Sequence, residues 1–309
     1  MKSCSVIIPT HNRKRILSKS LTALFDQTYP AEGYEIIVAD DGSNDGTEEL
    51  LGSLAPPCSI RYLRLEKMGA ARARNRAIEE ARGSVILFID DDTVATRRFM
   101  EDHLKIHEAR EKAIVQGPVL TTHDIERPDR LRLNMVDIYQ NLKDLHPCFF
   151  PAGNVSVRKE HIVKAGLFDE EFSGYGWEDM ELGKRLLKLG LKSVRCYFRC
   201  IAFHYKEEFK PEDLTAIRRR ERDKGFSSAL YYSKLPTLET RLAIRHSSLY
   251  YFLDRFISAG GWLDNDAGEK VIRYLYRWKR RILLRIALNT YTYHHYMVAL
   301  RQALGGSER

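Results

Sequence analysis

Long apolar runs are missing from this 309-residue sequence, because nowhere do about 18 apolar residues follow one another as a membrane-spanning helix requires. The first apolar run ends at Pro9, which is too early for a secretory signal peptide. Low-complexity tracts and internal repeats are also missing, which argues against a disordered or fibrous chain. We therefore expect a globular protein of the cytoplasm without a membrane-spanning helix.

Cysteine is scarce and shows no spacing typical of a metal site or a disulfide framework. The five cysteines form no C-x-x-C pair, and an odd number leaves at least one thiol outside any set of disulfides. We expect reduced and mostly buried thiols at Cys4, Cys58, Cys148, Cys196 and Cys200.

A deficit of acidic residues is confined to the last third of the chain. The net charge is +8, and residues 211–309 hold 18 Lys/Arg against 10 Asp/Glu, which accounts for the whole excess. Residues 1–210 are electrically balanced. This distribution predicts a neutral catalytic body at 1–210 and a basic helical appendage at 211–309.

The sequence does contain an alternation of strand-like and helix-like stretches up to about residue 110. Short apolar runs such as Val6-Ile7-Ile8 are typical of strands whose two faces are covered by helices. The pattern predicts an α/β fold with a mixed, mainly parallel sheet, because successive βα units place their strands in parallel. Strands are expected at 5–9, 34–39, 60–65 and 85–89, and helices at 13–27, 45–54, 69–82 and 97–110.

Polar residues follow three of these expected strands. Ligands gather at the carboxyl ends of parallel strands, so we expect the three turns to meet at one edge of the sheet. The turns are Pro9-Thr10-His11-Asn12, Asp40-Asp41-Gly42-Ser43 and Asp90-Asp91-Asp92.

The acidic triplet is the first candidate site. Two carboxylates that look the same way off a loop can hold a hard divalent cation and leave positions open for phosphate oxygens. His204, at the end of an expected strand over 201–204, can add a nitrogen ligand. The alternatives are an acidic cap at a strand-to-helix turn for the triplet and a structural role for the histidine.

Asp41 and the third expected helix form a second candidate site. A carboxylate at a strand end can accept the imide hydrogen of a uracil ring, although the same turn also suits the approach to a capped helix. Arg72, Arg74 and Asn75 can reach ribose or phosphate, or can simply face solvent.

A third candidate is the run Gly174-Tyr175-Gly176-Trp177-Glu178-Asp179, which opens an expected helix over 177–189. It sets aromatic rings, on which sugars stack, directly before two acids in the first turn of a helix. A carboxylate there can act as a general base, and the helix dipole favours its ionised form. An ordinary helix start with two acidic residues is the alternative.

These segments together resemble family 2 glycosyltransferases of the GT-A fold, over about residues 3–206. The likeness rests on the order and spacing of the runs at 5–12, 40–43, 73–75 and 88–92. The run from Gly166 to Gly183 resembles the acceptor-side segment of galactosyl- and N-acetylgalactosaminyltransferases and of chondroitin-type polymerases. A nucleotide-binding half at about 1–120 and an acceptor-binding half at about 121–210 are therefore expected.

The resemblance implies roles for the candidate residues. It implies a D-x-D metal motif at Asp90 and Asp92, with His204 as a further ligand of Mn²⁺ or Mg²⁺. Asp179 would be the catalytic base, Glu178 would bind acceptor or donor hydroxyls, and Tyr175 and Trp177 would lie against the acceptor. The nucleotide-sugar would contact Pro9, Thr10, His11, Asn12, Asp41, Arg74, Asn75, Asp90, Asp91, Gly153 and Asn154. His11 stands where many relatives carry a tyrosine.

The expected activity is an inverting, metal-dependent transfer of a sugar from a nucleotide diphosphate-sugar, with UDP favoured. The acceptor would be a hydroxyl of a glycan or of a lipid-linked molecule in cell-surface polysaccharide synthesis. A sugar-1-phosphate nucleotidyltransferase is one alternative, but that class carries a glycine-rich loop with Lys or Arg where this chain has Pro9-Thr10-His11-Asn12. A non-catalytic glycan-binding protein on the same fold is another alternative.

The tail over about 268–304 is expected to form one basic amphipathic helix. Its apolar face would carry Val271, Tyr274, Leu275, Trp278, Ile282 and Ile286, with Arg273, Arg277, Arg280 and Arg281 opposite. Such a helix suits peripheral contact with the anionic inner face of a membrane. Packing on the catalytic body or in a homodimer is the alternative, and no nucleic-acid-binding motif accompanies the helix.

Overall fold

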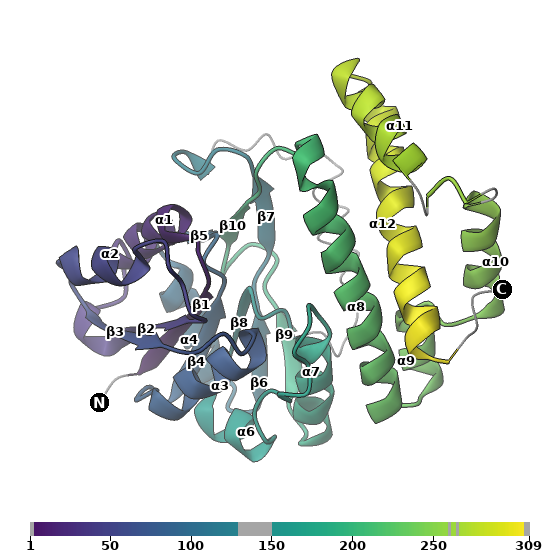
Figure 1. Cartoon of the computed structure of the whole chain (residues 1–309). Coiled ribbons are helices and arrows are strands. Elements are labelled where there is room, and N and C mark those ends of the chain that lie inside the picture. Colours follow the sequence, from purple (N-terminus) through teal and green to yellow (C-terminus); the bar gives the residue numbers. More distant parts are fainter. Residues whose placement is uncertain (1–2, 129–149, 259–260, 264–265, 306–309) are drawn as a thin grey trace. The chain divides into compact units, whose positions relative to one another are not determined.

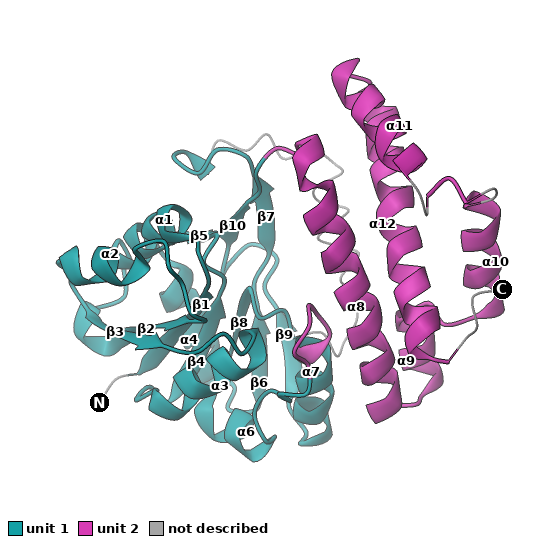
Figure 2. Cartoon of the chain, viewed as in Figure 1, with its two compact units in different colours: residues 1–171, 179–207 teal, residues 172–178, 208–309 magenta. Residues whose placement is uncertain are grey.

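The computed structural model of the chain consists of two compact units (Figure 2). An α/β unit comprises Met1–Glu171 and Asp179–Glu207, and a helical unit comprises Phe172–Glu178 and Glu208–Arg309. The segment 172–178 belongs with the helical unit. The structure describes residues 3–128, 150–258, 261–263 and 266–305, so Cys148 lies outside it.

A seven-stranded sheet is the frame of the α/β unit (Figure 1). Its order is β3-β2-β1-β4-β8-β6-β9, and neighbours are parallel except that β8 is antiparallel to both β4 and β6. The expected mixed, mainly parallel sheet is therefore confirmed. The strands are β1 (Cys4–Thr10), β2 (Tyr34–Asp40), β3 (Ser59–Arg64), β4 (Val85–Ile89), β6 (Ala113–Gln116), β8 (Asn154–Arg158) and β9 (Lys192–Arg195).

Helices cover both faces of this sheet, as the continuous apolar strands indicate. Val6 and Ile8 of β1 are fully buried in a cluster with α1 and α4, whereas Ile7 is fully buried on the other face with α3 and α7. Each such side chain contributes about 1.5–3 kcal/mol of hydrophobic stabilisation. The helices are α1 (Lys14–Phe25), α2 (Thr47–Ser53), α3 (Ala70–Glu80), α4 (Phe99–Ala109), α6 (Lys159–Lys164) and α7 (Glu178–Lys188).

A smaller sheet of order β5-β10-β7 adjoins the end of β4. It consists of β5 (Thr93–Ala95), β7 (Val119–Thr122) and β10 (Ala202–Tyr205). The interpretation of Asp90-Asp91-Asp92 as a cap of the following helix is wrong, because β5 starts directly after the triplet and α4 begins only at Phe99. The triplet is instead a turn between two strands, and β10 pairs antiparallel with β5 so that His204 lies opposite Thr93.

The helical unit is organised around α8 (Leu214–Lys234) and α12 (Arg281–Ala303), which lie side by side (Figure 2). Their close approach depends on Gly225, where a Cβ would lie 2.6 Å from the carbonyl oxygen of Tyr296. The other helices are α9 (Leu238–Ala243), α10 (Ser248–Ile257) and α11 (Asp266–Arg277). Among the described residues, no helix combines the length and the apolar content that crossing a bilayer requires.

The prediction of one continuous helix over 268–304 is wrong, because the chain breaks between α11 and α12. Lys279 takes a left-handed φ of 51°, the Lys279 N–H donates to Tyr276 O, and the Arg280 N–H donates to Leu275 O. These are the two hydrogen bonds of a Schellman cap, which ends a helix. Leu275 turns inward with Ile272, whereas Tyr274 and Trp278 stay exposed.

Two buried histidines bind the helix α4 to strand β8. The His103 ring lies between Ser156 Oγ at 2.8 Å and Asn154 Oδ1 at 3.0 Å, and His107 Nε2 lies 2.8 Å from the same Ser156 Oγ. Burial lowers the pKa of His103 to about 3 and that of His107 to about 4. Both rings are therefore neutral in the folded protein at neutral pH.

We expect these histidines to destabilise the fold as the pH falls below about 6.5, because the unfolded chain then binds protons that the folded chain excludes. Each ring should lower the free energy of unfolding by about 1.4 kcal/mol per pH unit. When the pH falls from 6.5 to 5, the free energy of unfolding, measured by urea titration, should decrease by roughly 2 kcal/mol less in His103→Gln than in the wild type. His123→Gln, at an exposed position, is the control. An equal loss in all three proteins would contradict this account.

Candidate functional site

The loops after β1 and β4 are joined through Asp91. These two strands are parallel neighbours, so their carboxyl ends lie together. Thr10 Oγ1 donates to Asp91 Oδ2 at 2.7 Å, and Ser20 Oγ of α1 donates to the Asp91 carbonyl oxygen at 2.7 Å. Burial raises the pKa of Asp91 to about 6, although the charge of Arg13 and the hydrogen bond from Thr10 oppose this rise. Asp91 therefore connects the turn after β4 to β1 and to α1.

Arg13 connects the first loop to two carboxylates of the triplet. Its Nη1 lies 3.1 Å from Asp91 Oδ1 and 2.6 Å from Asp92 Oδ2. The sequence motifs do not single out this residue, and its only signal is a cation directly after His11-Asn12 in the loop that faces the triplet. The guanidinium offsets the repulsion between two adjacent, largely buried carboxylates.

Asp92 and His204 come from strands far apart in sequence and meet at the small sheet. His204 Nε2 lies 3.2 Å from Asp92 Oδ2. Burial alone would raise the pKa of Asp92, but the hydrogen bond with His204 and the charge of Arg13 outweigh it and lower that pKa. The same bond raises the pKa of His204. Asp92 Oδ1 is buried and accepts no hydrogen bond, so one carboxylate oxygen is left over for a cation.

Asp90 is placed by an arginine and by a glycine. Arg74 Nη2 of α3 lies 3.3 Å from Asp90 Oδ1. A Cβ on Gly153 would lie 2.7 Å from Asp90 Oδ2, so only glycine leaves room for this carboxylate position. Among the described residues, no three His, Cys, Asp or Glu side chains form a closed metal site. The arrangement is an open one, in which a cation held by Asp92 and His204 would need oxygen ligands from a bound molecule.

The loops after β1 and β2 are connected by hydrogen bonds between backbone N–H groups and side chains. The Asn12 N–H, at a residue with a left-handed φ of 52°, donates to Ser43 Oγ at 2.7 Å, and Asn12 Oδ1 accepts the Asn44 N–H at 2.8 Å. The Asp41 carboxylate accepts the N–H groups of Met68, at 2.6 Å, and Gly69, at 3.0 and 3.1 Å. Asp41 thus holds the start of α3 in place beside the loop of Pro9 and His11.

Two of the asparagines expected to contact the nucleotide-sugar form side-chain hydrogen bonds within the protein. Asn75 donates to Phe168 O at 2.9 Å and accepts the Phe168 N–H at 2.9 Å. Asn154 is fully buried, accepts from His103 and donates to Cys200 O at 2.8 Å. Both side chains fix neighbouring segments in the described structure.

The start of α7 lies where the two units divide. Trp177 has a left-handed φ of 76°, which costs a bulky residue about 1–3 kcal/mol, and its ring stacks on Tyr231 of α8 at 5.3 Å and 20°. Tyr175 is half exposed, and the Arg220 guanidinium lies 5.5 Å from its ring centre. Trp177, Tyr175 and Arg220 therefore form an aromatic and cationic group within the helical unit.

The two acids of α7 follow this aromatic group directly. Glu178 and Asp179 are half-buried, and Asp179 Oδ1 accepts the N–H of Met180 at 2.7 Å. Further along α7, Arg185 binds both carboxylate oxygens of Glu181 and donates to the carbonyl oxygens of Ala165 and Leu167. This anchor fixes the helix that carries Asp179.

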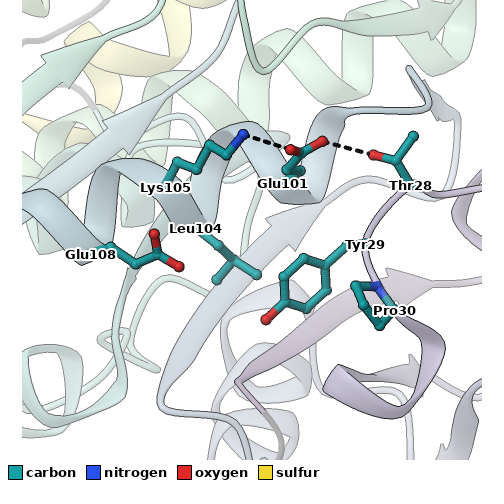
Figure 3. Close-up of a pocket in the computed structure, with 7 residues that line it drawn as sticks. All are labelled: Thr28, Tyr29, Pro30, Glu101, Leu104, Lys105 and Glu108. Atoms are coloured by element: carbon teal, nitrogen blue, oxygen red, sulfur yellow. Dashed lines mark hydrogen bonds and ion pairs between the residues drawn. The ribbon is translucent and has the colours of Figure 1, made fainter.

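Residues that the sequence separates widely are thus brought together at one edge of the α/β unit. Contacts at the end of β4 join Thr10, Arg74, Asp90, Asp91, Asp92, Gly153 and His204. A surface hollow of about 230 Å³ lies elsewhere, between the loop Thr28–Pro30 and α4 (Figure 3). Three of its polar side chains are bonded to one another, because Glu101 accepts from both Lys105 and Thr28.

Comparison with known protein families gives two matches. The model of glycosyl transferase family 2 matches residues 5–166, and the model of the N-terminal domain of galactosyltransferase matches residues 139–209. The first match contains the turns after β1, β2 and β4, and the second contains the start of α7 and His204.

Curated relatives are glycosyltransferases of greater length. An uncharacterised glycosyltransferase of Bacillus subtilis, YfnE, is 31% identical in an alignment over 239 residues that covers 60% of this chain and 61% of that protein. Chondroitin synthase of Escherichia coli is 27% identical in an alignment over 272 residues that covers 75% of this chain and 38% of that protein. The chain therefore spans less than two thirds of these relatives.

Solved structures share the fold at low sequence identity. A mannosyltransferase from Pyrobaculum calidifontis, in complex with GDP-Man and Mn²⁺, has a TM-score of 0.64 at 19% identity and covers 97% of this chain and 86% of its own. TarS 1-349 of Staphylococcus aureus with UDP-GlcNAc has a TM-score of 0.55 at 17% identity, with 100% and 93% covered. These likenesses show the GT-A fold. Because its first family model covers more than half of the sequence, the chain belongs to glycosyl transferase family 2.

Proposed function

We propose that this protein is an inverting, metal-dependent glycosyltransferase that moves a sugar from a nucleotide diphosphate-sugar to a hydroxyl acceptor. The observation that carries the proposal is the contact between His204 and Asp92 at the end of β4, with Asp92 Oδ1 buried and without a hydrogen bond. A structural neighbour that holds GDP-Man and Mn²⁺ supports it.

Asp92 and His204 would hold Mn²⁺ or Mg²⁺, with Asp90 beside them. The ion, when bound, supplies positive charge against the departing diphosphate. Arg13 and Arg74 orient the carboxylates by ion pairs at 2.6 and 3.3 Å, so the ligands are arranged before a donor arrives. The buried Asp92 oxygen fits this role because a hard cation is an alternative partner to a hydrogen-bond donor.

The loop residues Pro9, Thr10, His11, Asn12 and Asp41 would border the nucleoside, and uridine diphosphate is the nucleotide we favour. The backbone bonds between the loops give this wall a defined shape. Support comes from a structural neighbour that binds UDP-GlcNAc. In this role Asp41 would act chiefly by holding the Met68–Gly69 backbone, because its oxygens already accept those N–H groups.

Asp179 would act as the general base. It would take the proton of the acceptor hydroxyl as that oxygen bonds to the anomeric carbon and the diphosphate leaves with the electrons of the broken bond. A single displacement of this kind inverts the anomeric centre. Glu178 and the rings of Trp177 and Tyr175 would bind the sugar of a glycan or lipid-linked acceptor, and chondroitin synthase among the relatives supports a role in polysaccharide synthesis.

Asp92→Ala should lower metal-dependent transfer by at least about 10²–10³-fold, because the leaving group loses its main electrostatic stabiliser. Release of nucleotide from a panel of donors with Mn²⁺ measures the rate, and Mn²⁺ titration by calorimetry measures the loss of binding. Asp26→Ala, which removes an exposed carboxylate paired with Arg97, is the matched control. Near-normal rates in Asp92→Ala, or full wild-type activity in excess chelator, would refute the metal assignment.

Asp179→Asn keeps the shape of the side chain but cannot take up a proton. Transfer should fall by about 10²–10⁴-fold, while the affinity for the nucleotide-sugar is unchanged. Glu178→Gln is the matched variant one residue away, and it should affect KM for the acceptor more than kcat. If Glu178→Gln is inactive and Asp179→Asn is active, the base has been assigned to the wrong acid.

A further inference from the structure

The helical unit exposes apolar side chains on both sides of the break between α11 and α12. They are Val271, Tyr274 and Trp278 before the break and Ile282 and Ile286 after it, and this set is called the α11–α12 stripe below. Trp278 is 60% exposed, Ile282 78% and Ile286 57%. The inward sides of both helices are already packed, because Ile272 and Leu275 of α11 contact Leu284 and Leu288 of α12 in one cluster. An apolar surface of this kind on a folded unit marks a contact with something else.

The charge around the stripe is predominantly positive. Residues 270–307 contain eight Lys/Arg and no Asp/Glu. Arg273 lies 3.7 Å from Glu269, which is a weak ion pair at the rim. The cations nearest to the stripe in sequence are exposed, and they are Arg273, Arg277, Lys279, Arg280, Arg281 and Arg285. The partner of this surface therefore has to accept both apolar side chains and positive charge.

Charge distinguishes the α11–α12 stripe from the other exposed apolar face of the unit. Helix α10 also turns Leu249, Phe252 and Phe256 outward, at 63%, 65% and 72% exposure. Only one basic residue, Arg255, lies within α10, so nothing on that helix selects an anionic partner. The α11–α12 stripe combines exposed apolar side chains with neighbouring positive charge, whereas α10 has only the exposed apolar side chains.

A second copy of the chain fits the stripe poorly. In a two-fold dimer the same patch faces itself, so the six cations would stand opposite six cations. Juxtaposed like charges oppose association. A nucleic acid would accept the cations, but it would leave the aliphatic side chains of Ile282, Leu283 and Ile286 without an apolar partner.

We propose that the α11–α12 stripe docks on an anionic lipid bilayer surface. Trp278, Ile282 and Ile286 would enter the boundary between headgroups and acyl chains, and the surrounding arginines would bind lipid phosphates. Tryptophan and tyrosine favour this boundary because one end of each ring is apolar and the other can hydrogen-bond. The docking does not depend on the proposed sugar transfer, since it uses none of the residues assigned to catalysis.

The test uses the full chain and vesicles of phosphatidylcholine with or without about 30 mol% phosphatidylglycerol, separated by flotation. Binding should require the anionic lipid and should weaken when NaCl is raised from about 0.1 to about 0.5 M. Arg277→Gln/Arg280→Gln/Arg281→Gln should reduce the partition coefficient about 10²-fold. Trp278→Ser/Ile282→Ser should reduce it at least about 10-fold.

Matched controls separate the stripe from bulk charge and bulk hydrophobicity. Lys112→Gln/Lys188→Gln/Lys192→Gln removes three exposed charges from the α/β unit, and Phe198→Ser removes an apolar side chain that is 91% exposed there. Both control proteins should bind like the wild type. Circular dichroism checks that each variant is folded, and the exposed positions make misfolding a minor effect.

Four outcomes would overturn the proposal. The first is no binding to anionic vesicles, and the second is binding that the stripe variants leave unchanged. The third is self-association of a protein that does not bind vesicles, measured by sedimentation velocity without vesicles. If the stripe variants abolish this self-association, the stripe is assigned to a contact with a second copy. RNA that binds the wild type while vesicles do not would assign it to a nucleic acid instead.

Discussion

Two adjacent, largely buried carboxylates at the end of β4 are the constraint on which the site depends. Asp91 and Asp92 repel each other and lose hydration, so the fold has to supply cations and hydrogen-bond donors next to them. Arg13 comes from the loop after β1, Thr10 from the end of β1, and His204 from the small sheet. Removing any one of them would leave buried charge uncompensated, which costs more than the contact itself contributes.

The small sheet helps to compensate the buried charge of Asp92, because it positions His204. Strand β5 is only three residues long and starts directly after Asp92, so it has little stability of its own. Its pairing with β10 sets His204 opposite Thr93, one residue away from Asp92 in the chain. A histidine from the C-terminal part of the α/β unit is thereby held next to a turn from its N-terminal part. The His204–Asp92 contact is a consequence of strand register rather than of a flexible loop, which favours a constant geometry.

The sequence predicts most of the sheet because a short continuous apolar run such as that of β4 is stable as a strand only when helices cover both of its faces. It also predicts the acidic triplet and His204 as neighbours, through the family resemblance. It does not predict Arg13, because a single cation in a loop has no periodicity, or the break at Lys279, because neither glycine nor asparagine marks it. Asn154 looks like a ligand-binding amide in the sequence, and only the packed core reveals that its partners are His103 and Cys200.

The direction in which an amphipathic helix faces is not contained in its hydrophobic pattern. On α10 the buried side is the polar one, because Asp254 is 2% exposed and binds His294 at 3.0 Å and Arg301 at 2.6 Å, both on α12. A buried carboxylate cannot turn outward without breaking these ion pairs, so Phe252 on the opposite side has to face solvent. A polar network inside the helical unit thus decides which apolar side chains of α10 are exposed. The periodicity of the sequence predicts that α10 has an apolar face, but it does not predict whether that face points inward or toward solvent.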